Sequence, residues 1–453
     1  MSSRHKVLIA NRGEIAIRVI KTCRKIGLRT VAVYSDADAN SIHVRLADES
    51  YHLGPSNPLK SYLNIEKLAE IIEKSKADLV HPGYGFLAEN AEFAKTVSKL
   101  RATWVGPPAD LLDKLSSKTY SRKMAHEAGI PVIPGTFEPV SENELEQIAF
   151  QIGFPLLIKP DRGGGGKGTK LIRSPEELSR EIFSSAAREA QYGFGNPSLY
   201  VERLLDKPRH IEVQIIADKY GNVYALGERE CTIQRRYQKI IEEAPSPAVT
   251  HSDRLYIYEL AKRYAEKIGY MNAGTVEMLR DGSGRFYFLE MNKRIQVEHP
   301  VTEMTTGLDI VELQLKVALE EELPLEKDMT PVGHSIECRI YAEDPKTFIP
   351  SPGKVTEFQQ PDDNFVRLDH AIEKGTTIAP YYDPLIAKAI SYGATRDEAR
   401  LKMYTYLRQL RIEGVKTNIP FLLAVLNTNE FKTGNFYTSW IDEMLLNGGF
   451  AIV

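Results

Sequence analysis

Cysteine, net charge and long apolar runs are all scarce in this chain of 453 residues. The three cysteines, Cys23, Cys231 and Cys338, form no C-x-x-C pair, which excludes a disulfide framework and a zinc knuckle. No run approaches the roughly 18 consecutive apolar residues of a transmembrane helix. With 58 basic and 61 acidic side chains the net charge is −3, so no general nucleic-acid-binding surface is expected. We therefore predict a protein of a reducing compartment that binds neither nucleic acid nor membrane.

What the chain does have is the composition of a globular protein with a large core. Hydrophobic residues make up 42% and charged residues 26%. At roughly 100–200 residues per domain, the length predicts two to four domains. The first residues lead directly into the strand-like segment 7–10, without an apolar signal segment or an Arg/Ser-rich leader. A cytoplasmic location is the expectation.

The first hundred residues alternate strand and helix patterns. Strands are predicted at 6–10, 30–34 and 78–81, and helices at 14–26 and 65–75, with Gly27 ending the first helix. This rhythm indicates a parallel sheet with right-handed crossovers. Segments 11–14 and 81–90 would follow two of its strands, at the end where such sheets bind ligands. This first region is expected to end near Pro107 and Pro108.

Four successive glycines, Gly163 to Gly166, are the most unusual feature of the second region. They stand between strand-like segments 156–158 and 169–172, with Lys159 and Lys167 at their flanks. Such a run is either a flexible linker or a hairpin loop that closes over phosphate, and its position favours the hairpin. It matches neither of the two common phosphate-loop motifs. A third region, from about residue 333, mixes short strands with a helix predicted at 396–410.

A predicted hairpin carries the densest group of polar residues. Strands 273–280 and 285–292 flank the turn 281–284, and simple pairing would place Glu277 opposite Phe288 and diagonal to Glu290. Alternation then puts Glu277, Phe288, Glu290 and Asn292 on one face. Two carboxylates about 5 Å apart repel by roughly 3 kcal/mol at an effective dielectric near 20, which calls for a cation. Oxygen-only ligands favour magnesium. From spacing alone, a solvated acidic face is an equal alternative.

The residues after this hairpin favour the metal hypothesis. Arg294, Gln296 and Glu298 keep the same parity, so an extended segment would align a cation, an amide and a carboxylate beside the metal ligands. Such a strip is able to bind a small oxyanion and deprotonate it.

Two upstream segments leave alternatives open. Glu202, followed by Leu204 and Leu205, would suit the edge of a purine, and a structural salt bridge is equally common at such a position. Segment 228–239 gathers cations towards its end at Lys239. These cations would either offset triphosphate charge or form an ordinary solvated charge run.

Five motifs, taken together and in order, closely resemble biotin carboxylase, the ATP-grasp component of biotin-dependent carboxylases. They are segments 11–16 (NRGEIA), 81–86 (HPGYGF), the glycine loop, 290–299 (EMNKRIQVEH) and 337–340 (ECRI). The similarity runs from about residue 4 to about 445. It implies a multidomain α/β fold, with a Rossmann-like pre-ATP-grasp domain at 1–115 and an ATP-grasp domain at 116–330. The glycine-rich lid would span about 132–204, and a biotin carboxylase C-terminal domain 331–447.

The resemblance also implies a reaction. ATP would phosphorylate bicarbonate to carboxyphosphate, which carboxylates the ureido nitrogen of biotin held on a separate carrier protein. The implied cofactors are ATP, Mg²⁺ or Mn²⁺, and biotin. The implied partners are a biotin carboxyl carrier protein, a second copy of the chain, with Arg18 on the interface helix, and a carboxyltransferase subunit. No biotinyl-lysine tetrapeptide is present and no transferase domain follows, so these functions would belong to other chains or to a longer one.

Site residues follow from the resemblance, position by position. Those around the nucleotide are Lys118, Lys159, Gly165, Gly166, Glu202, Leu205, His210 and Gln234. Glu277, Glu290 and Asn292 match the magnesium ligands. Arg294, Gln296 and Val297 match the bicarbonate pocket, and Arg294 is held essential for catalysis in the family. Glu298 matches the general base, Lys239 a lysine near phosphate and bicarbonate, Arg339 the arginine that stabilises the biotin enolate, and Tyr84 a residue beside biotin.

The chain departs from the family pattern at four places. Tyr237 stands where histidine is usual, Thr169 where methionine is usual, segment 160–162 is bulkier, and Lys293 replaces a small or uncharged residue. We expect these to affect rate and nucleotide affinity more than reaction type. Two alternatives remain: another ATP-grasp ligase, of the carbamoyl-phosphate synthetase or aminoimidazole ribonucleotide carboxylase kind, and a non-catalytic nucleotide-binding subunit.

Overall fold

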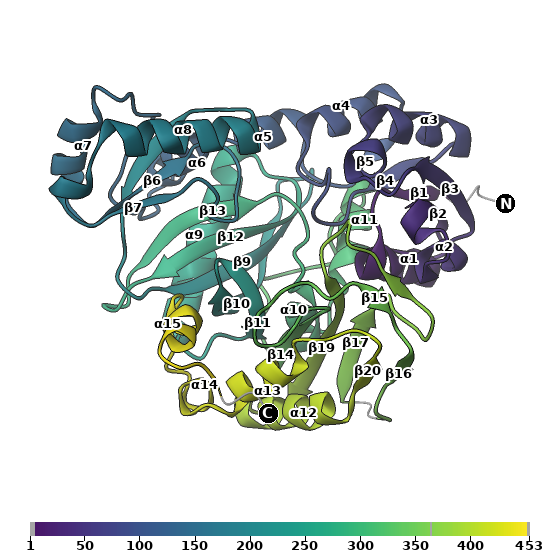
Figure 1. Cartoon of the computed structure of the whole chain (residues 1–453). Helices are drawn as coiled ribbons and strands as arrows, with labels where there is room; N and C mark the ends of the chain where they lie inside the picture. The colour runs from purple at the N-terminus through teal and green to yellow at the C-terminus, as the bar shows by residue number, and fades with distance from the viewer. Residues whose placement is uncertain (1–4, 363–364, 451–453) are drawn as a thin grey trace.

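The computed structural model describes residues 5–362 and 365–450. Figure 1 shows three parts: the N-terminal region at the upper right, a small lobe with α7 and α8 at the upper left, and the C-terminal region below. In the described part of the chain, no helix combines the length and apolar character needed to cross a membrane.

The N-terminal region is a five-stranded parallel sheet in the order β3-β2-β1-β4-β5, which confirms the predicted strand–helix rhythm. Gly27 follows the first helix with φ +79°, as the sequence predicted. The elements are β1 (Lys6–Ile9), α1 (Gly13–Lys25), β2 (Arg29–Ser35), α2 (Ile42–Leu46), β3 (Glu49–Gly54), α3 (Ile65–Ser75), β4 (Leu79–His81), α4 (Ala91–Lys99) and β5 (Thr103–Trp104).

Strands β1 and β4 lie side by side where the strand order reverses, and a crevice forms at such a point. The loops after these two strands are the two segments that the sequence placed at a ligand-binding edge. They contact each other, because Asn11 Nδ2 donates to the carbonyls of Pro82 and Tyr84, both at 2.7 Å. The prediction that the two segments follow strands of this sheet is confirmed.

A second, eight-stranded sheet has the order β13-β12-β9-β10-β11-β14-β19-β17, and every neighbouring pair is antiparallel. It runs without interruption from the predicted hairpin into the third region. Its strands are β9 (Arg209–Ala217), β10 (Val223–Arg235), β11 (Gln238–Ala244), β12 (Asn272–Arg280), β13 (Phe286–Asn292), β14 (His334–Tyr341), β17 (Val366–His370) and β19 (Leu385–Gly393). Helix α9 (His251–Ile268) buries Ile257, Leu260 and Tyr264 in the core beneath it.

The small lobe is a three-stranded sheet, β7-β6-β8, with helices α7 (Leu145–Ile152) and α8 (Arg180–Phe194) packed on it (Figure 1). Strands β6 (Leu156–Pro160) and β7 (Lys170–Ile172) pair antiparallel, and β8 (Leu199–Arg203) lies on the other side of β6. The glycine run therefore lies in a hairpin loop, and the linker interpretation is wrong.

The other elements complete the connections and the C-terminal region, where α12 confirms the helix predicted at 396–410. They are α5 (Ala109–Lys114), α6 (Lys118–Glu127), α10 (His299–Thr306), α11 (Ile310–Ala318), β15 (Gly353–Lys354), β16 (Glu357–Gln359), β18 (Thr377–Ile378), α12 (Arg396–Gln409), β20 (Arg411–Glu413), α13 (Ile419–Asn427), α14 (Asn429–Thr433) and α15 (Trp440–Leu446).

Candidate active site

The hairpin β12–β13 has a different register from the one predicted. Met278 pairs with Phe288 and Glu277 with Glu290, so Leu289 is the extra residue of a β-bulge. Phe288 therefore points into the core, where its ring lies 4.7 Å from that of Tyr264, and it does not share the carboxylate face. The prediction for Phe288 is wrong because the bulge exchanges the two faces of the strand.

The same bulge turns the polar residues towards one large cavity, of about 1260 Å³. All the predicted site residues line it: Tyr84, Lys118, Lys159, Gly165, Gly166, Glu202, Leu205, His210, Gln234, Lys239, Glu277, Glu290, Asn292, Arg294, Gln296, Val297, Glu298 and Arg339. They come from the N-terminal loops, the small lobe, the large sheet and the segment after β13. The structure thus brings the whole predicted set together.

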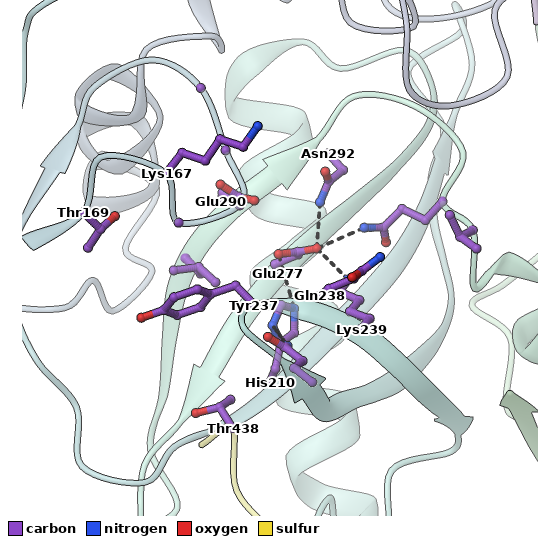
Figure 2. Close-up of a pocket in the computed structure, with 18 of the residues that line it drawn as sticks. Lys167, Thr169, His210, Tyr237, Gln238, Lys239, Glu277, Glu290, Asn292 and Thr438 are labelled. Atoms are coloured by element: carbon purple, nitrogen blue, oxygen red, sulfur yellow. Dashed lines mark hydrogen bonds and ion pairs between the residues drawn. The ribbon is translucent and has the colours of Figure 1, made fainter. Parts of the chain in front are cut away.

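Glu277 is the centre of the hydrogen-bond network in this cavity (Figure 2). Its Oε1 accepts from Asn292 Nδ2 at 2.8 Å, Gln296 Nε2 at 3.0 Å and Lys239 Nζ at 2.9 Å. Its Oε2 lies 3.2 Å from His210 Nε2. Burial alone would raise the pKa of Glu277, but Lys239 and His210 outweigh it and hold that pKa well below its usual range. Glu277 is therefore an anion at neutral pH.

Lys239 connects three buried carboxylates. Besides Glu277, its Nζ lies 2.6 Å from an oxygen of Glu212 and 2.6 Å from Oε1 of Glu298. Glu212 also pairs with Arg229, and the side chains of both are inaccessible to solvent. The cations of this cluster balance much of its negative charge, which is what makes the burial of so many carboxylates tolerable.

Glu298 lies between two cations. Its Oε1 receives a hydrogen bond from Lys239, and its Oε2 one from Arg339 Nη2 at 2.9 Å. Burial raises the pKa of Glu298, but Lys239 and Arg339 outweigh this effect and lower that pKa to about 2. Glu298 is thus ionised at neutral pH and able to accept a proton.

The strip after β13 faces the cavity as its parity predicted, although the strand itself ends at Asn292. Arg294 Nη2 donates to Asn292 Oδ1 at 3.1 Å. Gln296 Oε1 accepts from Arg229 at 2.8 Å, and the carbonyl of Val297 accepts from Lys388 Nζ at 2.6 Å. Each member of the strip is therefore held by a specific contact.

On the small-lobe side of the cavity, Glu202 is salt-bridged. Lys159 Nζ lies 2.7 Å from its Oε1, and Arg122 Nη1 lies 3.1 Å from its Oε2. The structural salt bridge that the sequence left open is present, and the purine contact stays a prediction. Lys118 Nζ lies 2.5 Å from Glu290 Oε2, so this lysine reaches the hairpin from the start of α6.

The glycine loop meets the tip of the β10–β11 hairpin. Arg236 and Tyr237 form its two-residue turn with φ +48° and +65°, the backbone twist that such hairpins favour. The Tyr237 ring lies so close to Gly166 that a Cβ on this glycine would be 2.6 Å from Tyr237 Cδ2. Of the cations in segment 228–239, Lys239 lines the cavity, whereas Arg235 pairs with Glu343 at 3.1 Å.

Sequence reasoning did not single out several residues that hold the site. They are Glu89, Arg122, Glu212, Arg229 and Lys388. Glu212 could have been found from the sequence, since it lies two positions after His210 and alternation places both on the same strand face. The others act through partners far away in the sequence, and local spacing carries no trace of such pairs.

The donor set of the cavity fits a hard divalent cation. Glu277 and Glu290 are directly opposite in the hairpin register, and Asn292 supplies an amide oxygen. Glu290 keeps 32% of its side chain exposed. His210, Glu212 and Glu277 form another close group of possible ligands, and this group includes an imidazole nitrogen. The first set, with oxygen donors only, is the one that suits Mg²⁺.

Comparisons with known proteins agree with this geometry. Residues 3–112 match the family model described as biotin carboxylase, N-terminal domain, and residues 337–443 the one described as biotin carboxylase C-terminal domain. Residues 117–326 match the model described as carbamoyl-phosphate synthase L chain, ATP binding domain.

Relatives cover almost the whole chain. The Bacillus subtilis protein named biotin carboxylase 2 is 48% identical over 97% of this chain and 99% of its own length. The Haemophilus influenzae protein named biotin carboxylase is 45% identical over 97% of this chain and 98% of its own length. A solved structure of the biotin carboxylase domain dimer of Hydrogenobacter thermophilus 2-oxoglutarate carboxylase, in complex with MgADP, ADP and bicarbonate, aligns with a TM-score of 0.94. It is 44% identical and covers 98% of each chain.

Proposed function

This chain belongs to the biotin carboxylase family, and from that premise we propose that it carboxylates biotin on a carrier protein, using bicarbonate and ATP. The observation that carries the proposal is the ionised Glu298, held between Lys239 and Arg339 in the cavity that also contains the glycine loop and the Glu277–Glu290 pair. A base, two cations and a phosphate-binding loop in one cavity are what the reaction requires.

In the first step, an oxygen of bicarbonate attacks the γ-phosphorus of ATP. The new P–O bond gives carboxyphosphate, and the bond to the β-phosphate oxygen breaks to release ADP. Lys118, Lys159 and the backbone of Gly165 and Gly166 would bind the nucleotide phosphates, near Glu202, Leu205, His210 and Gln234. Glu277, Glu290 and Asn292 would hold Mg²⁺, which supplies positive charge beside the phosphates when bound.

Glu298 would take the bicarbonate proton, since it is ionised and faces the cavity. Arg294, Gln296 and Val297 would hold the oxyanion during this step. In the second step the ureido nitrogen of biotin gives its proton to the departing phosphate and bonds to the carboxyl carbon, while the bond between that carbon and the phosphate oxygen breaks. Arg339 would stabilise the enolate form of biotin, with Tyr84 beside the ring and Lys239 near the phosphate. Closure of the glycine loop would exclude water from the labile carboxyphosphate.

The partners and the domain limits belong to the same proposal. As partners we propose a carrier protein and a carboxyltransferase subunit. The proposed assembly is a homodimer, and the proposed domains are 1–115, 116–330 and 331–447, with a lid of about 132–204. The dimer named in the related Hydrogenobacter structure supports the homodimer. Arg18 itself is buried within one chain, where it pairs with Glu303 at 2.6 Å and Asp309 at 2.8 Å.

The test is ADP release from MgATP, with and without bicarbonate and free biotin, in the wild type and in Glu298→Gln. We expect release that requires bicarbonate and rises with biotin. Loss of the base should lower kcat by about 10²–10⁴-fold, with folding unchanged because Gln is nearly isosteric. Nucleotide binding without ADP release under any substrate combination would contradict the proposal and favour a non-catalytic partner.

A further inference from the structure

Lys293 is a lysine almost entirely inside the protein, directly before the cavity residue Arg294. Its side chain is only 6% exposed. It is absent from the residues that line the cavity, so it does not touch a ligand there. Burying an ammonium group is costly unless it is paired, and this one has two partners.

Both partners of Lys293 come from distant segments. Its Nζ lies 3.0 Å from Oε2 of Glu89, in the loop after β4, and donates to the carbonyl of Leu115 at 3.3 Å. Leu115 is the C-cap residue that follows α5, where a cation is favourable because the last carbonyls of a helix are otherwise unpaired. The charge of Lys293 is thus balanced by Glu89, and its position is held by the hydrogen bond to Leu115.

Glu89 connects Lys293 with Arg294, because each of its two carboxylate oxygens faces one of them. While Oε2 of Glu89 faces Lys293, its Oε1 lies 3.1 Å from Nε of Arg294. The other two nitrogens of Arg294 donate to the carbonyl of Ile295 and to Asn292 Oδ1, each at 3.1 Å. Within the chain Arg294 therefore makes two hydrogen bonds and one ion pair. A guanidinium has five N–H donors, so donors remain for a ligand in the cavity.

We infer that Lys293 is a positioning residue that keeps Arg294 available for the oxyanion substrate, by occupying one oxygen of Glu89. Carboxylate and guanidinium groups readily form two parallel hydrogen bonds. Without Lys293, the freed oxygen of Glu89 would take a second N–H of Arg294 and turn that edge away from the cavity. The inference rests on the proposed function and adds to it a specific requirement for binding bicarbonate.

The test compares Lys293→Met, Lys293→Arg and the double variant Lys293→Met/Glu89→Gln in steady-state ADP release. Lys293→Met should raise the KM for bicarbonate about tenfold and leave the KM for MgATP unchanged. Lys293→Arg keeps the charge and should stay within about twofold of the wild type. In the double variant an uncharged amide faces Arg294 and forms no ion pair with it, so the KM for bicarbonate should return towards the wild-type value.

A merely structural role for Lys293 gives a different result. In that case Lys293→Met would lower the melting temperature and change both KM values together. Adding Glu89→Gln would remove a further ion pair and make both defects larger. An unchanged KM for bicarbonate in Lys293→Met, or a double variant no better than the single one, would overturn the inference. A crystal structure of Lys293→Met is a readout that needs no activity: we expect two Glu89–Arg294 hydrogen bonds, and the single contact of the wild type would count against it. If the wild type releases no ADP with bicarbonate, the proposed function fails instead.

Discussion

At the scale of single residues, the basicity of Glu298 depends on what its two cations contact. With Lys239 and Arg339 on its oxygens, its pKa of about 2 makes it a weak base. Anionic substrates in the cavity would draw these cations towards themselves and raise the proton affinity of Glu298. The base would then become effective only when the substrates are bound, which limits unproductive reactions.

Glu242, which contacts Arg339, is a buried carboxylate whose pKa is raised, whereas that of Glu298 is lowered. It is inaccessible to solvent, lies opposite Glu337 across β11 and β14, and has an oxygen 2.5 Å from Arg339 Nη2. Burial raises the pKa of Glu242 to about 7, with Glu298 adding to the rise and Arg339 opposing it. The folded state therefore binds this proton more tightly than the unfolded state does.

The wild type should lose stability as the pH rises and Glu242 ionises. We predict that the Glu242→Gln variant lacks this loss. A raised carboxyl pKa gives stability that is fully present below about pH 4.5 and is lost as the pH rises through about 7. Glutamine does not titrate. The free energy of unfolding of the variant minus that of the wild type should therefore increase by up to about 3 kcal/mol from about pH 5 to pH 8. Urea titrations at both pH values measure this difference, and a pH-independent difference would refute the prediction.

At the scale of elements, sequence patterns predicted a part of the local structure, namely the strands and helices that the sequence analysis named. The helices predicted at 65–75 and 396–410 match α3 and α12 closely. In α3 the apolar residues Leu68, Ile71 and Ile72 recur at helical spacing and are buried, which is the pattern of an amphipathic helix. The glycine hairpin followed from its flanking strands. The bulge at Leu289 could not be predicted by alternation, since a single extra residue leaves no periodic mark.

The contact between the glycine loop and Tyr237 gives the next prediction, for Gly166→Ala. Gly166 has φ +69° and faces the Tyr237 ring, so a methyl group adds backbone strain and a steric conflict. We expect the KM for MgATP to rise roughly tenfold, equivalent to about 1.4 kcal/mol. The measurement is ADP release as a function of MgATP concentration.

Two neighbouring glycines serve as matched controls. Gly165 has φ +68° but no atom near its Cβ position, so Gly165→Ala tests strain alone. Gly164 has neither feature, so Gly164→Ala should be close to wild type. Tyr237→Ala in the Gly166→Ala background should bring the KM down to the level of Gly165→Ala. Equal effects at all three glycines would rule out a specific role for Tyr237.

At the scale of the whole molecule, the site exists only because distant segments converge. Loops at the switch point of the N-terminal sheet, the small lobe and the eight-stranded sheet all contribute residues to one cavity. The resemblance of five motifs supplied the members of this set, but not their partners. Glu202 with Arg122, and Val297 with Lys388, are separated by 80 and 91 residues, so local patterns do not reveal them.

The most direct test of the central claim is transfer of labelled carbon from bicarbonate to biotin. The purified chain is incubated with MgATP, ¹⁴C-bicarbonate and free biotin, and carboxybiotin is trapped as its methyl ester and counted. We predict ATP-dependent label in carboxybiotin, equimolar with the biotin-dependent ADP released, and a rate of labelling lower by about 10²–10⁴-fold with Glu298→Gln. ADP release without labelled carboxybiotin would contradict the account, because bicarbonate and ATP would then react without biotin as the acceptor.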